Sequence, residues 1–137
     1  MMEQAKVLHQ IAASPDRVWK TLTSNEGAKA YMMGAEVDAD WRQGGKMTIR
    51  GEYQGKRFED HAEVRTFEPE KELAYTHVSG AAPDHPHMVV FRLAPKDGGT
   101  ELTVTQAGDE APSAEEKARY EKTWWTMVEA LARAAAR

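Results

Sequence analysis

The sequence predicts an α+β domain in which a curved antiparallel β-sheet wraps around one long C-terminal α-helix. Residues 113–136 contain no glycine or proline and repeat large apolar side chains at helical spacing. Residues 36–106 consist instead of short alternating segments separated by turn residues, as in hairpin-linked strands. Successive strands with short links pair antiparallel, and the long helix needs an apolar surface to cover.

The C-terminal segment carries the clearest helix signals. Ser113 is followed three residues later by Glu116, the capping-box pattern that satisfies free backbone N–H groups of the first turn. Large apolar side chains then fall on one helical face: Tyr120, Trp124, Met127, Val128 and Leu131. Trp125 lies 100° from Trp124, at the margin of this face. It covers an opening, contacts a partner subunit or flanks the core.

Length and composition indicate a single domain over residues 1–137. The net charge is −4 and no basic stripe exists, so we expect no nucleic-acid partner. The chain has no cysteine, which excludes disulfides and thiolate chemistry. No apolar run is long enough to span a membrane and no signal-peptide pattern is present, so we expect a cytoplasmic protein. The chain is expected to be a monomer or a homodimer.

The N-terminal third predicts one strand and two short helices. Residues 6–13 alternate in the manner of a strand. Ser14, Pro15 and Asp16 are typical of a helix start, because serine caps, proline suits the first position and aspartate complements the helix dipole. The helix that follows turns Val18, Trp19 and Leu22 inward, and residues 28–33 form a second helical turn.

The central region predicts strands joined by hairpin turns. Asp97, Gly98 and Gly99 form the strongest turn signal, and residues 79–86 are expected to be a loop. The expected strands cover residues 36–41, 46–53, 57–67, 73–78, 87–94 and 100–106. A twisted sheet of these strands around the last helix is the helix-grip arrangement.

Several sequence segments also resemble a known family. They are Ile11–Trp19 with Leu22-Thr23, Tyr31-Met32, Gly44–Met47, Glu63-Val64 through Glu68-Pro69 to Leu73–Thr76, Gly98–Gln106, and Trp124 with Val128 and Leu131. In order and spacing, the chain resembles the SRPBCC (START/birch-allergen-like) superfamily, and within it homologues of the activator of the heat-shock-protein-90 ATPase. The resemblance implies a helix-grip fold with an apolar cavity, and it carries no catalytic signature.

Such a cavity would lie between the sheet and the final helix. We therefore predict a binding protein, without catalytic residues, for a small hydrophobic molecule. The alternative is that the same side chains simply pack as a core, which burial alone would justify. The candidate cavity residues are Met32, Met47, Tyr53, Phe58, Tyr75, His77, Met88, Val90, Trp124, Val128 and Leu131.

Ionisable groups on the strands would supply any chemistry in the cavity. Asp60 and Ala62 share one face of their strand while His61 and Glu63 share the other, so only one pair points inward. His77, next to Tyr75 on one face, is the best candidate for acid–base work. The other groups considered are Arg50, Glu52 and Arg92. The alternative is that these residues sit on the solvated face of the sheet.

This chemistry defines a second functional hypothesis. In the superfamily that the chain resembles, polyketide cyclases use such groups to orient substrates and exchange protons. The resemblance therefore implies an enzyme of the cyclase or dehydratase kind as the alternative function. A third hypothesis is an interaction module linked to chaperones or stress. An apolar lining favours binding, inward ionisable groups favour catalysis, and a filled interior with an exposed apolar patch favours an interaction module.

Other chemistries lack sequence support. His85 and His87, with Asp84, could hold a metal, but the sequence places no further ligand, so no metal site is predicted. No Gly-x-Ser-x-Gly motif is present, and the double glycines lie between strands rather than before a helix. We therefore expect no cofactor.

Overall fold

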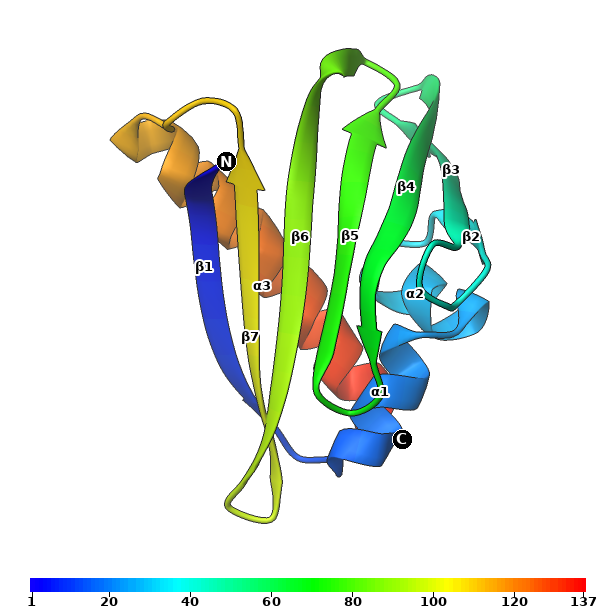
Figure 1. Cartoon of the computed structure of the whole chain (residues 1–137), viewed down its shortest axis with the longest axis vertical. Helices are drawn as coiled ribbons and strands as arrows, with labels where there is room; N and C mark the ends of the chain where they lie inside the picture. Colours follow the sequence, from blue (N-terminus) through cyan, green and yellow to red (C-terminus); the bar gives the residue numbers. More distant parts are fainter.

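The computed structural model describes residues 1–137 and has the helix-grip fold that the sequence predicts (Figure 1). Helix α3 crosses one face of a curved sheet, and two short helices follow the first strand. The elements are β1 Met2–Ile11, α1 Pro15–Leu22, α2 Asn25–Tyr31, β2 Glu36–Ala39, β3 Lys46–Tyr53, β4 Lys56–Glu68, β5 Glu72–Ser79, β6 Ala82–Lys96, β7 Gly99–Gly108 and α3 Ala114–Ala136.

All seven strands form one antiparallel sheet in the order β1-β7-β6-β5-β4-β3-β2. Sequential hairpins build the sheet from β2 to β7, and β1 then pairs with β7 as the opposite edge strand. Every strand therefore has one face toward α3 and one face away from it, and side-chain parity decides which residues can reach the interior.

The turn between β5 and β6 differs from the sequence prediction. Residues 79–86 are not a loop, because the strands continue to the turn residues Gly80 and Ala81, with Ser79 paired to Ala82. A register shift between His77 and Ser79 accommodates the additional residues of β6. The prolines of this part of β6 are tolerated because pairing with β7 begins only at Met88.

An aromatic cluster occupies the centre of the core. The ring of Phe91 on β6 is fully buried and lies 6.0 Å from Tyr31, 5.9 Å from Tyr75 and 5.8 Å from Trp124, measured between ring centroids. These contacts join α2, β5, β6 and α3. Each aromatic pair adds about 0.5–1.5 kcal/mol beyond the burial of its area.

Helix α3 begins with the predicted capping box. The Glu116 backbone N–H donates to Oγ of Ser113 at 3.1 Å, and the Ser113 N–H donates to Oε1 of Glu116 at 3.0 Å. One turn later, Oε2 of Glu121 accepts from the backbone N–H of Lys6, at 2.9 Å. The carboxylate thus ties α3 to the edge strand β1.

The elements that contact α3 determine where space remains between the helix and the sheet. The helix backbone lies mainly against β1, α1 and α2. Over the middle strands only side chains fill the gap between helix and sheet. Large side chains such as Phe91 and Leu131 are fully buried in this gap and fill part of it.

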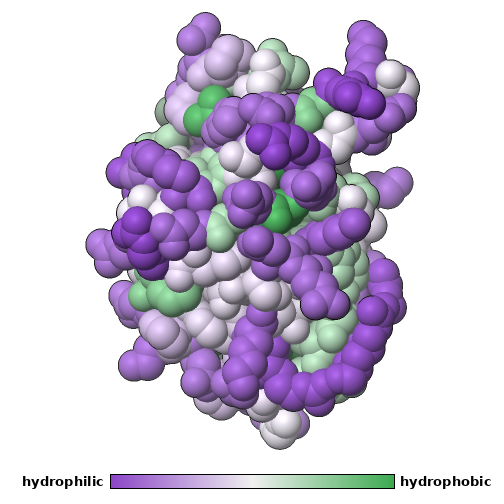
Figure 2. All heavy atoms as spheres, turned by 90° about the vertical axis from the view of Figure 1, so that its right-hand side faces the viewer, coloured by the Kyte–Doolittle hydropathy of each residue, from purple (hydrophilic) through white to green (hydrophobic).

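The face of the molecule on the side of β2 and β3 is predominantly hydrophilic (Figure 2). Figure 2, which views the molecule from the side of β2 and β3 in Figure 1, shows hydrophobic residues as small patches between hydrophilic ones. Trp125 is 43% exposed and packs on His9 of β1, with ring centroids 4.9 Å apart. None of the helices is both long enough and apolar enough to cross a membrane.

Candidate functional site

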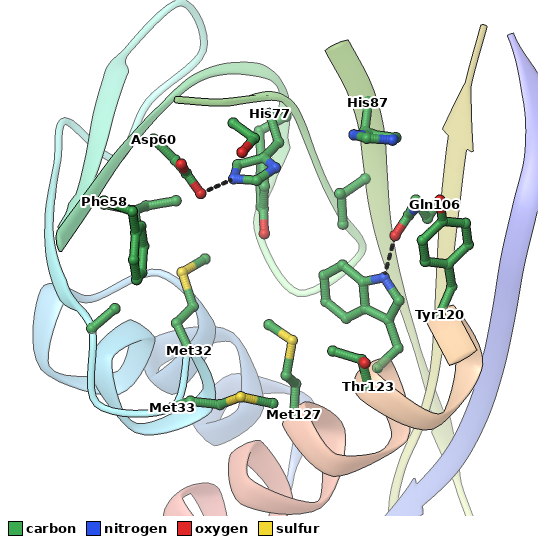
Figure 3. Close-up of a pocket in the computed structure, with 16 residues that line it drawn as sticks. Met32, Met33, Phe58, Asp60, His77, His87, Gln106, Tyr120, Thr123 and Met127 are labelled. Atoms are coloured by element: carbon green, nitrogen blue, oxygen red, sulfur yellow. Dashed lines mark hydrogen bonds and ion pairs between the residues drawn. The ribbon is translucent and has the colours of Figure 1, made fainter. Parts of the chain in front are cut away.

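A cavity of about 310 Å³ lies between the sheet and α3 (Figure 3). The cavity is partly open to solvent, so it is a pocket at the edge of the core and not a sealed void within it. Ten of its 16 lining residues are hydrophobic. All 16 lining residues come from the α2–β2 connection, β3 to β7 and α3: Met32, Met33, Ala35, Ile49, Phe58, Asp60, Tyr75, His77, Ser79, His87, Val89, Gln106, Tyr120, Thr123, Trp124 and Met127.

The cavity is continuous with a groove on the surface. The groove measures about 600 Å³ and shares Met32, Met33 and Phe58, among other residues, with the cavity. Figure 3 shows these side chains and Met127 on the side of the cavity opposite the strands that carry His87 and Gln106. Flexible methionine side chains therefore form much of the wall nearest the groove, and such side chains adapt to varied shapes.

Gly51 permits the position of Phe58. The two residues are paired on β3 and β4, and a Cβ atom on Gly51 would lie 2.7 Å from the phenyl ring. The glycine therefore leaves room for the ring to lie over β3 and form a wall of the cavity.

Five of the eleven candidate cavity residues line this space. They are Met32, Phe58, Tyr75, His77 and Trp124. Three others, Met47, Val128 and Leu131, are buried in the core. Tyr53 is 70% exposed and lines the outer groove. Met88 and Val90 point to the opposite face of β6, because Val89 and Phe91 between and beside them are buried inward.

The sequence prediction of the cavity did not include several of its lining residues, notably His87, Val89, Gln106 and Met127. The alternation of side chains along β6 could have identified His87 and Val89. Charged Arg92 indicates the solvated face, and His87 and Val89 lie on the opposite face. Helical spacing could have found Met127, which lies one turn after Trp124 on the same face.

The most distinctive polar feature of the cavity is a carboxylate–imidazole pair. Nε2 of His77 lies 3.0 Å from Oδ2 of Asp60, and Oδ1 of Asp60 accepts from the backbone N–H of Gly80 at 2.9 Å. The side chains of Asp60 and His77 are 14% and 26% exposed. Because a carboxylate only accepts, the pair places the hydrogen on Nε2 and leaves Nδ1 free of Asp60.

Two further polar groups lie beside this pair. His87 is directly opposite His77 in the β5–β6 register. Burial lowers the pKa of His87, and the nearby His77 lowers it further. The phenol of Tyr75 is buried, which raises its pKa far above the usual value and keeps the hydroxyl protonated.

A hydrogen-bond chain fixes the wall formed by Trp124. Its indole N–H donates to Oε1 of Gln106 at 2.8 Å, and Nε2 of Gln106 donates to Oε1 of Gln4 at 2.9 Å. Nε2 of Gln4 then donates to the carbonyl of Glu110 at 3.0 Å. These amides are already bonded to one another, so they orient the indole more than they offer free groups to the cavity.

The remaining strand-borne ionisable groups lie outside the cavity. Arg50 and His61 contact Glu59, at 2.7 and 3.0 Å, and Arg92 contacts Glu72 at 2.9 Å. Glu52 is exposed and lines the outer groove. Of the two alternative pairs on β4, Asp60 and Ala62 face the interior.

His85 and His87, considered above as possible ligands of one metal ion, lie in different surroundings. Nδ1 of His85 lies 3.1 Å from Oδ2 of Asp109, whereas His87 lines the cavity. His85, Asp109 and Glu110 have ligand-type atoms within 4.8 Å of one another, but all three are exposed. Hydrogen bonding to Asp109 raises the pKa of His85.

Similar solved structures share the whole architecture. Protein ChR145 from Cytophaga hutchinsonii is 32% identical, with a TM-score of 0.80 and coverage of 94% of this chain and 90% of its own. Protein MLL2253 from Mesorhizobium loti is 26% identical, with a TM-score of 0.79 and coverage of 96% of each chain.

A third similar structure has a more distant sequence. DynU16, a protein of the dynemicin biosynthetic locus, is 23% identical, with a TM-score of 0.78. The match covers 94% of this chain but 45% of that protein, and at this identity it supports the fold alone. A search of curated proteins gave no match.

The family suggested by the sequence is confirmed over nearly the whole domain. The profile described as "Activator of Hsp90 ATPase homolog 1-like protein" matches residues 12–136. This span runs from the end of β1 to the end of α3 and so includes every wall of the cavity. The chain belongs to the Activator of Hsp90 ATPase homolog 1-like family, within the SRPBCC superfamily.

Proposed function

We propose that this protein binds a small, predominantly apolar molecule in the cavity between the sheet and α3. The observation that carries the proposal is the unfilled volume of about 310 Å³ between the sheet and α3, beside a hydrophobic core of 26 buried residues. Small-molecule sites begin at about 300 Å³ and combine apolar walls with a few convergent polar groups. Tyr75 and Trp124, which rest on Phe91, give the site rigid walls.

Native mass spectrometry of the protein purified from its own host tests this function. We expect a bound mass that is lost on denaturation. Calorimetric titration with naphthalene supplies a defined apolar probe. If no co-purified molecule is found and naphthalene does not bind either, the proposal is contradicted.

Two matched variants locate the binding. Met127→Trp places a bulky ring at the cavity wall. We expect it to weaken naphthalene binding at least about tenfold, because the indole would fill part of the space that naphthalene needs. Thr126→Trp adds the same ring one residue earlier, on an exposed position outside the lining. We expect this control to bind naphthalene as the wild type does.

A second candidate function is proton-transfer catalysis of the cyclase or dehydratase kind. The observation that favours it is that the lining is not wholly apolar, since Asp60, His77 and His87 reach the cavity. A carboxylate that orients an imidazole is a common arrangement for a general base. Exchange of α-protons of a bound cyclic ketone for deuterium, lost in His77→Phe, would support catalysis, and exchange unaffected by this change would refute it.

An interaction module has less support. That function would fit a filled interior and a large exposed apolar patch. The interior instead contains the cavity, and the exposed large apolar side chains include Leu8 on β1, Met33 at the cavity and Trp125 on α3.

A further inference from the structure

The chemistry of the cavity restricts the class of ligand it can hold. None of the 16 lining residues is lysine or arginine, whereas Asp60 contributes a carboxylate. Lys56 and Arg57 line the outer groove, but both are exposed and their charge is screened by solvent. An anionic headgroup inside the cavity would therefore be buried beside a carboxylate without a cation, which is strongly unfavourable.

The free hydrogen-bonding groups of the cavity lie together on β5 and β6. Nε2 of His77 is held by Asp60, so Nδ1 is the ring nitrogen available to a ligand. Figure 3 shows the His77 ring with its second nitrogen on the side away from Asp60. Unlike Tyr31, whose hydroxyl donates to the carbonyl of Leu22 at 3.3 Å, Tyr75 has no hydrogen-bond partner for its hydroxyl within the protein.

A hydroxyl group matches this wall better than an anionic group. It can donate to the lone pair of a neutral His77 Nδ1, and its oxygen can accept from the phenol of Tyr75 or from a ring N–H of His87. Because Asp60 fixes the imidazole, the hydrogen bond is pre-oriented and costs little ordering. The rest of the ligand meets Met32, Phe58 and Trp124, which provide apolar and aromatic contact.

We propose that the ligand is a neutral apolar molecule with a phenolic or alcoholic hydroxyl that hydrogen-bonds Nδ1 of His77. The Asp60–His77 pair is then the selectivity element of the cavity, and it discriminates against carboxylates and phosphates. This proposal rests on the binding function proposed above and adds the polar class of the molecule.

Four probes of similar size test the proposal by calorimetric titration of the full-length protein: naphthalene, 2-naphthol, 2-methoxynaphthalene and 2-naphthoate. We expect 2-naphthol to bind about threefold to tenfold more tightly than naphthalene, the gain from one net hydrogen bond. The methyl ether, which cannot donate to Nδ1 of His77, should bind more weakly than 2-naphthol. The carboxylate should bind at least about tenfold more weakly than 2-naphthol, because it is buried without a cation.

Two variants assign the selectivity to residues. In His77→Phe, which keeps an aromatic ring but removes Nδ1, the ratio of 2-naphthol affinity to naphthalene affinity should fall to about one. In Asp60→Asn, which removes the negative charge, the advantage of 2-naphthol over 2-naphthoate should shrink. Urea unfolding of each variant checks that the domain remains folded.

The outcomes separate this proposal from the binding function itself. Naphthalene binding with no preference for 2-naphthol, or with equal or tighter binding of 2-naphthoate, would overturn the proposed selectivity and leave the apolar site intact. Absence of binding by all four probes would overturn both. A preference for 2-naphthol that persists in His77→Phe would contradict the role of His77.

Discussion

The indole N–H of Trp124 donates to Oε1 of Gln106 across 2.8 Å, which connects α3 to β7 at the wall of the cavity. This bond fixes the orientation of the Trp124 indole between the hydrophobic core and the cavity. The amide that accepts it is itself held by Gln4, so the wall is supported from the edge strand β1.

Replacing Gln106 by methionine should destabilise the domain. The substitution leaves the indole N–H of Trp124 and Oε1 of Gln4 without this partner, at a cost of about 1–3 kcal/mol in the free energy of unfolding. Urea denaturation measures the change. Gln43→Met, at an exposed turn, is the matched control and should stay within about 0.5 kcal/mol of wild type. Equal effects of the two substitutions would refute the structural role of Gln106.

Two methionines should respond differently to truncation. Met47 is 1% exposed in the core, so Met47→Ala should cost about 2–5 kcal/mol. Met127 already borders open space, so Met127→Ala should cost about 1 kcal/mol, a typical single-substitution effect. Thermal or urea unfolding compares the two. A larger loss at Met127 than at Met47 would mean that the cavity is filled in solution.

Gly51 and Phe58 should be coupled. Gly51→Ala places a Cβ against the Phe58 ring and should cost about 1–3 kcal/mol through overpacking. In a Phe58→Leu background the ring is absent, and the same change should cost less. A double-mutant cycle of unfolding free energies measures the difference. Strict additivity would contradict the contact.

The histidines of β6 should titrate on opposite sides of the usual value. Asp109 raises the pKa of His85, while burial lowers the pKa of His87. NMR titration of the imidazole protons should show His85 above and His87 below the reference value of about 6.5. Asp109→Asn should bring the His85 midpoint down. A His87 midpoint above the reference would contradict its burial in the cavity.

The lowered pKa of His87 should make the stability of the domain depend on pH. The folded state holds its proton less tightly than the unfolded state. Its contribution to stability is therefore unfavourable at low pH, and it disappears as pH rises through the unfolded pKa of about 6.5. His87→Gln should accordingly gain stability relative to wild type as the pH is lowered from 8 to 5, measured by urea unfolding. An unchanged difference across this range would refute the shift.

The architecture was predictable because its signals are local. The capping box at Ser113, the apolar face of α3 and the Asp97-Gly98-Gly99 turn each define an element without long-range information. The prediction of a loop over residues 79–86 was wrong, because the prolines and the glycine of this segment are typical of loops. Their tolerance depends on where β7 ends, which is a tertiary fact.

The cavity was only partly predictable, because periodicity defines a face and not a depth. Trp124, Val128 and Leu131 share one face of α3, yet only Trp124 borders the cavity, since the other two lie where the helix meets the packed core. Tyr53 has the parity of Met47 but lies at the exposed end of β3. The contact between Asp60 and His77 joins two strands and depends on their register, which the sequence does not specify.

An apolar molecule that occupies the cavity should lie beside Trp124. The most direct measurement is an NMR titration of the four tryptophan indole N–H resonances with naphthalene. We expect a saturable shift of the Trp124 resonance, with Trp41, which bonds Asn25 away from the cavity, unchanged. A Trp124 resonance that does not move at saturating naphthalene, or a shift confined to exposed Trp125, would contradict the account.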